Sequence, residues 1–489
     1  MEDFQLLEPF SLKRFRGFQK EIVARTLQGK HSLVVMPTGG GKSLCFQAPA
    51  VHWHQQSSDD CSYRPLTVVL SPLIALMKDQ VDSLVAKGIP ATFINSSLYR
   101  TERNARYESI ERGENALLYV TPERFRKQDF IECINTRKIR LLAVDEAHCI
   151  SQWGHDYRPD YSRIAEFRNL IGNPTTIALT ATATPTVQED IAIQLGLDGI
   201  GRADNQCELF HEGIDRPNLE LTVSEVWGFD EKIEMIKEST ERWMAESAKP
   251  NRGSAIIYFT LIRTLDSFSE KLRQHGIAHS CYHGELSRQS RRLIQDDFMA
   301  GRMPLILATN AFGMGVDKSN IRLVIHADVP SSLESYYQEV GRAGRDGMPS
   351  ECRLLYDPND LATQMEFIRW SNPDSDFYDR IHHYLTTDLD RVRAFGMDWL
   401  RLQLCGKNKQ DRRLETALGM LERHGLIDQW DDLSVVSLLD NLLPPSLSDS
   451  NQLGAKLLND QKKLYAMVQY VQTTKDRQSF LRHYFGDSS

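Results

Sequence analysis

The sequence contains few cysteines, no long hydrophobic run and no strong excess of charge. Its eight cysteines are scattered, and they form neither a Cys-x-x-Cys pair nor a Cys/His cluster at the spacing of metal ligands. We therefore expect reduced, mostly buried thiols. No apolar run approaches the roughly 18 residues that a membrane-spanning helix needs, and the first ten residues are acidic and lack a positively charged leader. These features exclude a disulfide-stapled secreted domain and predict an intracellular protein with no membrane partner.

Charge and size set further limits. The net charge of -8 argues against diffuse binding to a polyanion, although a basic track on one face of the protein would be enough to bind a polyanion there. A chain of 489 residues is too long for one hydrophobic core and predicts roughly three domains. Its 41 % hydrophobic and 25 % charged residues are typical of a globular protein that folds throughout.

Short runs rich in Val, Ile and Leu alternate with helical stretches, which is the pattern of parallel sheets covered on both faces. The first series is His31–Met36, Leu66–Leu70, Ala116–Val120, Ile139–Val144 and Thr176–Leu179. The second is Ala255–Phe259, His279–Tyr282, Leu305–Thr309, Leu323–Ala327 and Cys352–Tyr356. The sequence thus predicts two tandem α/β lobes, at 1–210 and 211–360, and a mainly helical C-terminal region at 361–489. Asp215-Arg216-Pro217-Asn218, with its helix-breaking proline, is interpreted as the linker between the lobes.

The segment MPTGGGKS, at 36–43, lies between an expected strand and an expected helix. A loop that wraps phosphates must turn backbone N–H groups inward, and glycines allow this because they carry no obstructing side chain. We assign Lys42 to the β and γ phosphates and Ser43 to Mg²⁺. The nucleotide-binding candidates of this loop are Thr38, Gly39, Gly40, Gly41, Lys42 and Ser43. The alternative is a glycine-rich structural turn that happens to precede Lys-Ser.

Two carboxylates follow the expected strand at 141–144, in the tetrapeptide Asp145-Glu146-Ala147-His148. We assign Asp145 to Mg²⁺ and Glu146 to activation of the attacking water, as in phosphoryl-transfer sites. His148 completes this set of catalytic candidates. Taken alone, Asp-Glu after a strand could equally be a solvated cap or an ion pair, but the upstream phosphate loop favours the catalytic interpretation.

In the second lobe, Arg342 and Arg345 stand three residues apart in the segment QEVGRAGRDG, at 338–347. This spacing places them on one face of a helix or turn, and the glycines allow close approach to a neighbour. An arginine supplied across a cleft can neutralise charge on the γ-phosphoryl oxygens, so we interpret both as arginine fingers. The alternative is a surface turn whose arginines make exposed ion pairs.

Three further segments are SPLIALMKDQ at 71–80, TPER at 121–124 and LTATAT at 179–184. Together with the motifs above, they occur in the same order as the motifs of superfamily 2 helicases, which this chain resembles. The segment CISQWGHDYRPDY, at 149–161, resembles the aromatic-rich loop of the RecQ family. The resemblance implies RecA-like lobes and a loop that senses single-stranded DNA through Trp153, Tyr157 and Arg158. Aromatic side chains can stack on unpaired bases. Alternatively, Trp153 and Tyr161 pack beneath the sheet.

Further RecQ-like segments extend the resemblance over almost all of residues 10–357. By analogy, Arg16 and Gln19 contact adenine and Asp317 completes the nucleotide site, while Leu12 replaces an aromatic residue that is usual in the family. The family implies an ATP- and Mg²⁺-dependent 3′–5′ DNA helicase acting on single-stranded and tailed duplex DNA, and a cytoplasmic, nucleoid-associated protein or a nuclear one. An ATPase that remodels complexes without unwinding and an RNA helicase remain alternatives.

The C-terminal region departs from the family pattern. The segment 469–486 resembles the helix that opens the family's zinc module, but Asp476 stands where a cysteine is expected, so we predict no zinc. An expected helix at 414–426 and a short strand at 434–438 indicate either a winged-helix element or a helical brace on the second lobe. The resemblance is thus to a short RecQ-like protein or to a fragment of a longer one.

Overall fold

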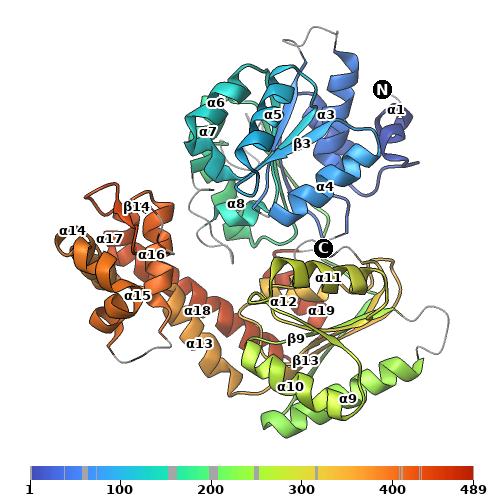
Figure 1. Cartoon of the computed structure of the whole chain (residues 1–489). Coiled ribbons are helices and arrows are strands. Elements are labelled where there is room, and N and C mark those ends of the chain that lie inside the picture. Colours follow the sequence, from blue (N-terminus) through green and yellow to red (C-terminus); the bar gives the residue numbers. More distant parts are fainter. Residues whose placement is uncertain are drawn as a thin grey trace. The chain divides into compact units, whose positions relative to one another are not determined.

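The computed structural model describes residues 3–37, 39–57, 64–72, 74–151, 161, 163–197, 207–246, 253–313, 316, 318–406, 408, 411–428, 430 and 432–487. These residues form two compact units (Figure 1). The first consists of Met1–Asp328, Glu334–Leu355 and Thr473–Ser489, and the second of Val329–Leu333 and Tyr356–Gln472. In the described ranges, no helix is both long and apolar enough to cross a membrane.

The first lobe is built on a sheet with the strand order β3-β4-β2-β5-β6-β1-β7, and every neighbouring pair in it is parallel. Its strands are β1 (His31–Val35), β2 (Leu66–Leu70), β3 (Ala91–Ile94), β4 (Leu117–Val120), β5 (Ile139–Val144), β6 (Thr175–Thr180) and β7 (Cys207–His211). Neighbouring residues of β1 enter opposite cores: Leu33 and Val35 pack in one, Val34 in the other. Both faces are therefore covered, as the continuous apolar runs predict.

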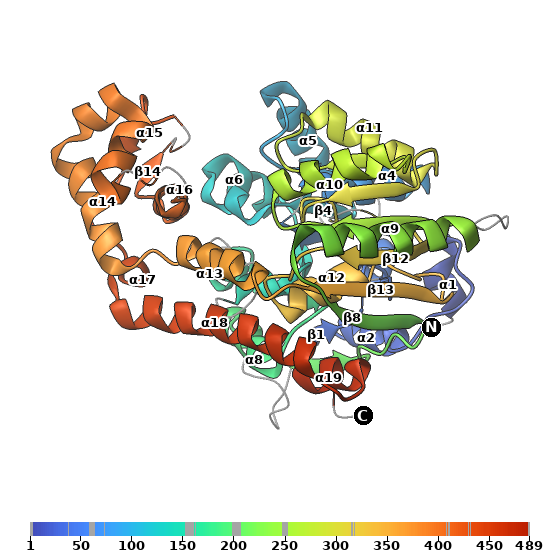
Figure 2. The same cartoon turned by 90° about the horizontal axis from the view of Figure 1, so that it is seen from below.

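The second lobe has the strand order β10-β11-β9-β12-β13-β8. The strands are β8 (Leu219–Glu225), β9 (Ser254–Tyr258), β10 (Ser280–Tyr282), β11 (Leu305–Ala308), β12 (Ile321–His326) and β13 (Ser350–Tyr356). Two helices, α9 (Gly228–Glu246) and α10 (Ile262–Gln274), lie side by side against this sheet (Figure 2). The predicted fold class is confirmed, with two parallel-sheet lobes and a helical C-terminal region.

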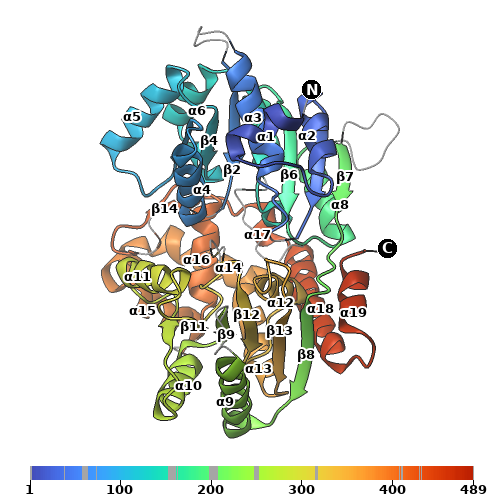
Figure 3. The same cartoon turned by 90° about the vertical axis from the view of Figure 1, so that its right-hand side faces the viewer.

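The chain returns to the first unit at its C-terminal end. Helix α19 (Arg477–Tyr484) lies beside the start of β8, and Gln478 Nε2 donates to the carbonyl oxygen of Leu219 at 3.3 Å (Figure 3). Asp476, the residue in the expected cysteine position, caps this helix by accepting a hydrogen bond from the Ser479 N–H at 2.7 Å.

The second unit is mainly helical. Its elements are α13 (Asp360–Ser371), α14 (Ser375–Thr387), α15 (Leu389–Cys405), α16 (Arg413–Arg423), β14 (Ile427–Asp428), β15 (Ser437–Leu438), α17 (Pro445–Ser448) and α18 (Ser450–Gln472). The strands β14 and β15 pair antiparallel, so α16 is followed by a hairpin. The expected helix at 414–426 ends earlier, at Arg423, and the expected strand at 434–438 shortens to two residues.

Candidate nucleotide site

The phosphate loop connects β1 to α3 (Leu44–Gln56). Gly39 and Gly41 have φ angles of 82° and 80°, which side-chain-bearing residues rarely adopt. A Cβ at Gly41 would also stand 2.5 Å from Gln19 Nε2. The glycines are therefore required both by the backbone conformation and by space. Thr38 lies outside the described residues.

Lys42 is held within this loop. Its Nζ donates to the carbonyl oxygen of Met36 at 2.9 Å. Burial lowers the pKa of Lys42, while the nearby carboxylates of Glu146 and Asp145 act in the opposite direction. Ser43 directly precedes α3, so it stands at the N-terminal end of a helix, where anions bind.

Asp145 extends the ladder between β5 and β2, because its N–H donates to the Leu70 carbonyl oxygen at 2.8 Å. The Asp145 side chain is buried, and burial together with the charge of Glu146 raises the pKa of Asp145 to about 7, against the effect of Lys42. Glu146 follows with a left-handed backbone, φ 48° and ψ 48°. The motif thus holds two carboxylates beside one lysine.

His148 links this motif to the next one. Its Nδ1 lies 3.1 Å from Thr180 Oγ1 and 3.4 Å from Glu146 Oε2. Thr180 in turn contacts Thr182, because Thr180 Oγ1 lies 3.0 Å from the Thr182 carbonyl oxygen. His148 therefore bridges the tetrapeptide at 145–148, called the DEAH box, and the LTATAT segment at 179–184. Sequence spacing alone does not reveal this pairing.

This arrangement fits a nucleoside triphosphate with Mg²⁺. Glycine N–H groups, a lysine and a helix N-terminus suit phosphate oxygens. Asp145 and Ser43 offer the oxygen ligands that Mg²⁺ prefers, one or two from the protein and the rest from phosphate and water. Glu146 Oε2 is buried and, apart from His148 Nδ1 at 3.4 Å, has no hydrogen-bond partner among the described residues, as suits a group that receives a proton from a bound water.

The adenine candidates Arg16 and Gln19 are fastened to the phosphate loop. Gln19 Nε2 donates to the carbonyl oxygens of Gly40 and Gly41, both at 3.1 Å, and Gln19 Oε1 accepts from the Arg16 N–H at 2.8 Å. The Gln19 side-chain amide, which is the expected adenine contact, therefore also contacts the phosphate loop.

One residue that sequence reasoning missed supports this segment. Glu212, which follows β7, accepts a hydrogen bond from the Phe18 N–H at 2.8 Å. Gly17 beside it has φ 46°, and a Cβ there would stand 1.7 Å from Glu212 Oε1. No local signal could have found Glu212, because it lies 194 residues from Phe18.

The two arginines of the second lobe are half-buried and face backbone carbonyls. Arg342 donates to Gly313, and Arg345 Nη1 donates to the Val316 carbonyl oxygen at 3.1 Å. The aliphatic part of Arg345 also comes within 3.6 Å of the point where a Cβ on Gly39 would stand. The structure therefore brings Arg345 to the phosphate loop of the first lobe, within the same compact unit.

Several predicted residues, Asp317, Trp153, Tyr157 and Arg158, lie outside the described residues. The preceding Ser151 is anchored, since its Oγ donates to Asp190 Oδ2 at 2.6 Å. Tyr161 is fully buried in the core of the first lobe, which favours the packing interpretation for that residue.

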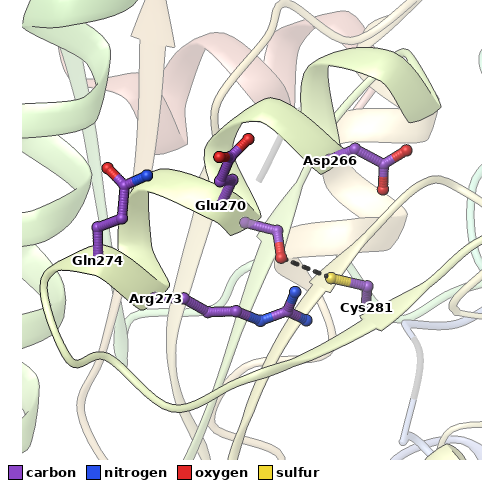
Figure 4. Close-up of a pocket in the computed structure, with 6 residues that line it drawn as sticks. Asp266, Glu270, Arg273, Gln274 and Cys281 are labelled. Atoms are coloured by element: carbon purple, nitrogen blue, oxygen red, sulfur yellow. Dashed lines mark hydrogen bonds between the residues drawn. The ribbon is translucent and has the colours of Figure 1, made fainter.

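A separate pocket of about 520 Å³ lies on the second lobe, between α10 and β10 (Figure 4). The Cys281 thiol there donates to Ser269 Oγ at 3.2 Å, and His279 Nε2 lies 2.9 Å from the same oxygen. Burial raises the pKa of Cys281, so the thiol is a poor nucleophile. We interpret this trio as a structural hydrogen-bond network.

Comparison with known proteins places these motifs in a family. Residues 16–191 match the DEAD/DEAH box helicase family model, and residues 231–347 match the helicase conserved C-terminal domain. The chain is 40 % identical to the ATP-dependent DNA helicase RecQ of Bacillus subtilis over 365 residues, which are 74 % of this chain and 57 % of that protein. It is 37 % identical over 366 residues to a "probable ATP-dependent DNA helicase RecS" of the same organism, covering 74 % of this chain and 68 % of the relative.

A solved structure, the Mycobacterium smegmatis helicase Lhr bound to ssDNA and AMP-PNP, shares the fold. It is 19 % identical with a TM-score of 0.56, and the match covers 91 % of this chain and 60 % of that one. The match to the curated RecQ relative of Bacillus subtilis spans little more than half of that protein's length. The chain therefore belongs to the RecQ family of superfamily 2 helicases, because both helicase family models match it and it is 37 to 40 % identical to the two Bacillus subtilis relatives.

Proposed function

We propose that the chain is an ATP-dependent DNA helicase that moves 3′ to 5′ along single-stranded DNA and unwinds tailed duplexes. The observation that carries the proposal is the grouping of Lys42, Asp145 and Glu146 on one lobe with Arg345 of the other lobe beside their phosphate loop. Family membership and the names of the relatives support DNA as the substrate.

In this proposal, ATP is hydrolysed when water attacks the γ-phosphorus and the bond to the β–γ bridging oxygen breaks. Glu146 orients the water and accepts its proton, and Lys42 holds the β and γ phosphate oxygens. Arg342 and Arg345 neutralise the charge that spreads over the γ-phosphoryl oxygens. Ser43 and Asp145 would hold Mg²⁺, which would supply further neutralisation of the phosphate charge.

The DNA side of the proposal depends on Trp153, Tyr157 and Arg158. The loop that carries them, at 149–161, begins directly after His148, so contact with DNA can reach Glu146 through a short length of chain. Most grip on the strand would come from phosphate contacts, so we expect little sequence specificity.

The test compares four nucleic acids of one sequence under identical salt: single-stranded DNA, single-stranded RNA, and duplexes with a 3′ or a 5′ tail. We expect ATP hydrolysis to rise at least tenfold with DNA and much less with RNA, and we expect unwinding of the 3′-tailed duplex. The Lys42→Ala variant serves as the control for contaminating ATPases.

Each other outcome contradicts a part of the proposal. Stimulation by RNA alone would indicate an RNA helicase. DNA-stimulated hydrolysis without unwinding of either duplex would indicate a remodelling ATPase. Asp476 supports this alternative, because it stands where the family's zinc module has a cysteine. Unwinding of the 5′-tailed duplex alone would reverse the polarity.

A further inference from the structure

The segment between β7 and β8 contains an arginine that touches neither the phosphate loop nor the DEAH box. The Arg216 guanidinium donates to three carbonyl groups of one turn, with Nη1 to Gly341 at 3.2 Å and Nη2 to Ala343 at 2.6 Å and to Gly344 at 3.0 Å. This turn follows α12 (Leu333–Val340) and carries Arg342 and Arg345. A residue expected only to link the lobes therefore grips the backbone of the arginine-finger turn.

Asn218 fixes the far side of the same turn. Its Nδ2 donates to the carbonyl oxygens of Gly344 at 2.8 Å and Met348 at 3.0 Å, and its own carbonyl oxygen accepts from the Ser350 N–H at 2.9 Å. Gly344 has φ 55°, and a Cβ there would stand 2.3 Å from Asn218 Nδ2. Close approach of Asn218 is thus one reason for glycine at this position.

The segment that contains Arg216 is itself held by contacts with two helices, α19 and α12. Gln478 Nε2 of α19 donates to the Arg216 carbonyl oxygen at 3.0 Å, and Arg482 pairs with Asp215 at 3.2 Å. On the other side, Tyr337 Oη of α12 donates to the Ile214 carbonyl oxygen at 2.7 Å. These contacts fix the backbone from which the Arg216 side chain extends.

We propose that Arg216 is a positioning residue, which orients the turn at 341–345 so that Arg342 and Arg345 meet the transferring phosphoryl group. The inference rests on the proposed function of these two arginines. Its physical basis is the planar guanidinium, whose donors can satisfy several carbonyl groups in fixed directions, whereas an ammonium is a point charge on a flexible stem. Displacement of a catalytic group by about 1 Å can cost a hundredfold in rate.

The test uses Arg216→Ala and Arg216→Lys, with Arg242→Ala as the matched control. Arg242 is a half-exposed arginine of the same lobe, and it pairs with Glu351 at 3.0 Å rather than with a residue of 341–345. Affinities for ADP and for ADP with aluminium fluoride, a mimic of the transferring phosphoryl group, are measured in the presence of single-stranded DNA. The melting temperature, kcat and KM for ATP are measured on the same preparations.

We expect ADP to bind both Arg216 variants within about twofold of the unaltered protein, because the adenine candidates Arg16 and Gln19 and the phosphate loop lie on the first lobe. Affinity for ADP with aluminium fluoride should fall about tenfold or more, and kcat should fall similarly with little change in KM. In an Arg342→Ala/Arg345→Ala background, adding Arg216→Ala should weaken aluminium fluoride binding little further, because both side chains that Arg216 positions are already absent.

The outcomes separate this inference from the proposed function. If Arg345→Ala alone binds ADP with aluminium fluoride normally, the arginine-finger assignment itself is wrong. If Arg345→Ala is impaired but Arg216→Ala is not, only the positioning role is wrong. Equal losses for ADP and for the mimic, with a lowered melting temperature in both Arg216 variants and full additivity with the Arg342→Ala/Arg345→Ala pair, would make Arg216 merely structural.

Discussion

Lys42 donates a hydrogen bond from Nζ to the carbonyl oxygen of Met36, 2.9 Å away, within its own phosphate loop. The lysine can therefore exchange one oxygen acceptor for another when a phosphate enters, without leaving an unpaired buried charge. The same contact places the ammonium beside the carboxylates of Asp145 and Glu146, which act on the pKa of Lys42.

The first prediction is that Lys42→Ala abolishes ATP turnover and leaves the fold intact. The substitution removes a phosphate ligand but opens no cavity in either core of the first lobe, so we expect a loss of at least about a hundredfold in kcat. Lys20→Ala, at an exposed lysine of α2 (Gln19–Leu27), is the control and should change neither rate nor melting temperature. Normal turnover by a folded Lys42→Ala variant would refute the site.

The second prediction concerns coupling between DNA and hydrolysis. We expect Trp153→Ala to reduce DNA-stimulated ATP hydrolysis far more than basal hydrolysis, because the aromatic loop is joined to Glu146 through the segment that contains His148. The measurement compares basal rate, stimulated rate and melting temperature on one preparation.

A core role for Trp153 predicts a different pattern. Loss of a large buried side chain costs about 3 to 5 kcal/mol, so the melting temperature and both rates would then fall together. That pattern would mean that the aromatic loop carries no signal in this chain.

The third prediction is that the purified protein contains no stoichiometric zinc. Asp476 caps α19, the seven cysteines in the described ranges are all free, and those ranges hold no cluster of three or more metal-type side chains. We expect Asp476→Ala to weaken α19 by about 1 kcal/mol through loss of the cap, with zinc content unchanged. One zinc per chain after a chelator wash, measured by elemental analysis, would contradict the prediction.

The fourth prediction is a pH dependence that originates in β1. His31 Nδ1 accepts from the Thr176 N–H at 2.9 Å, and burial, aided by the charge of Arg168, lowers the pKa of His31 to about 4. The unfolded chain, with a histidine pKa near 6.5, takes up a proton that the folded one does not. Stability is therefore complete above about pH 6.5 and falls as the pH drops from there towards 4.

Hydrogen exchange of the β1 amides between pH 7 and 4.5 tests this effect on local opening. In His31→Gln the side chain can still accept from Thr176 but does not titrate, so protection should fall less steeply with decreasing pH than in the unaltered protein. Parallel losses in the two proteins would show that other groups cause the acid sensitivity.

The sequence was sufficient for the interior of both lobes and insufficient at their edges. Continuous apolar runs identified the central strands to within two residues, because parallel strands buried on both faces have that signature. The edge strands β7 and β8 escaped detection, since half of their residues are partly exposed and polar. The edge strand β3 was missed as well, whereas the edge strand β10 was predicted.

The candidate site divides in the same way. The phosphate loop, the DEAH box and the arginine turn are local motifs with fixed spacing, so they could be found from the sequence. Glu212 and Arg216 could not, because each acts through contacts with residues 125 or more positions away, which only the folded chain brings together. A linker and an edge strand give no local sign that they support other segments.

The left-handed backbone of Glu146 has a consequence for how this chain can be improved. A residue with a side chain costs of the order of 1 kcal/mol or more in that conformation, and glycine would relieve the cost. A search for thermostable variants that ignores activity should therefore favour Glu146→Gly. The protein keeps a carboxylate at a place where folding alone would select against it, so part of its stability is given up in return for a residue that can receive a proton.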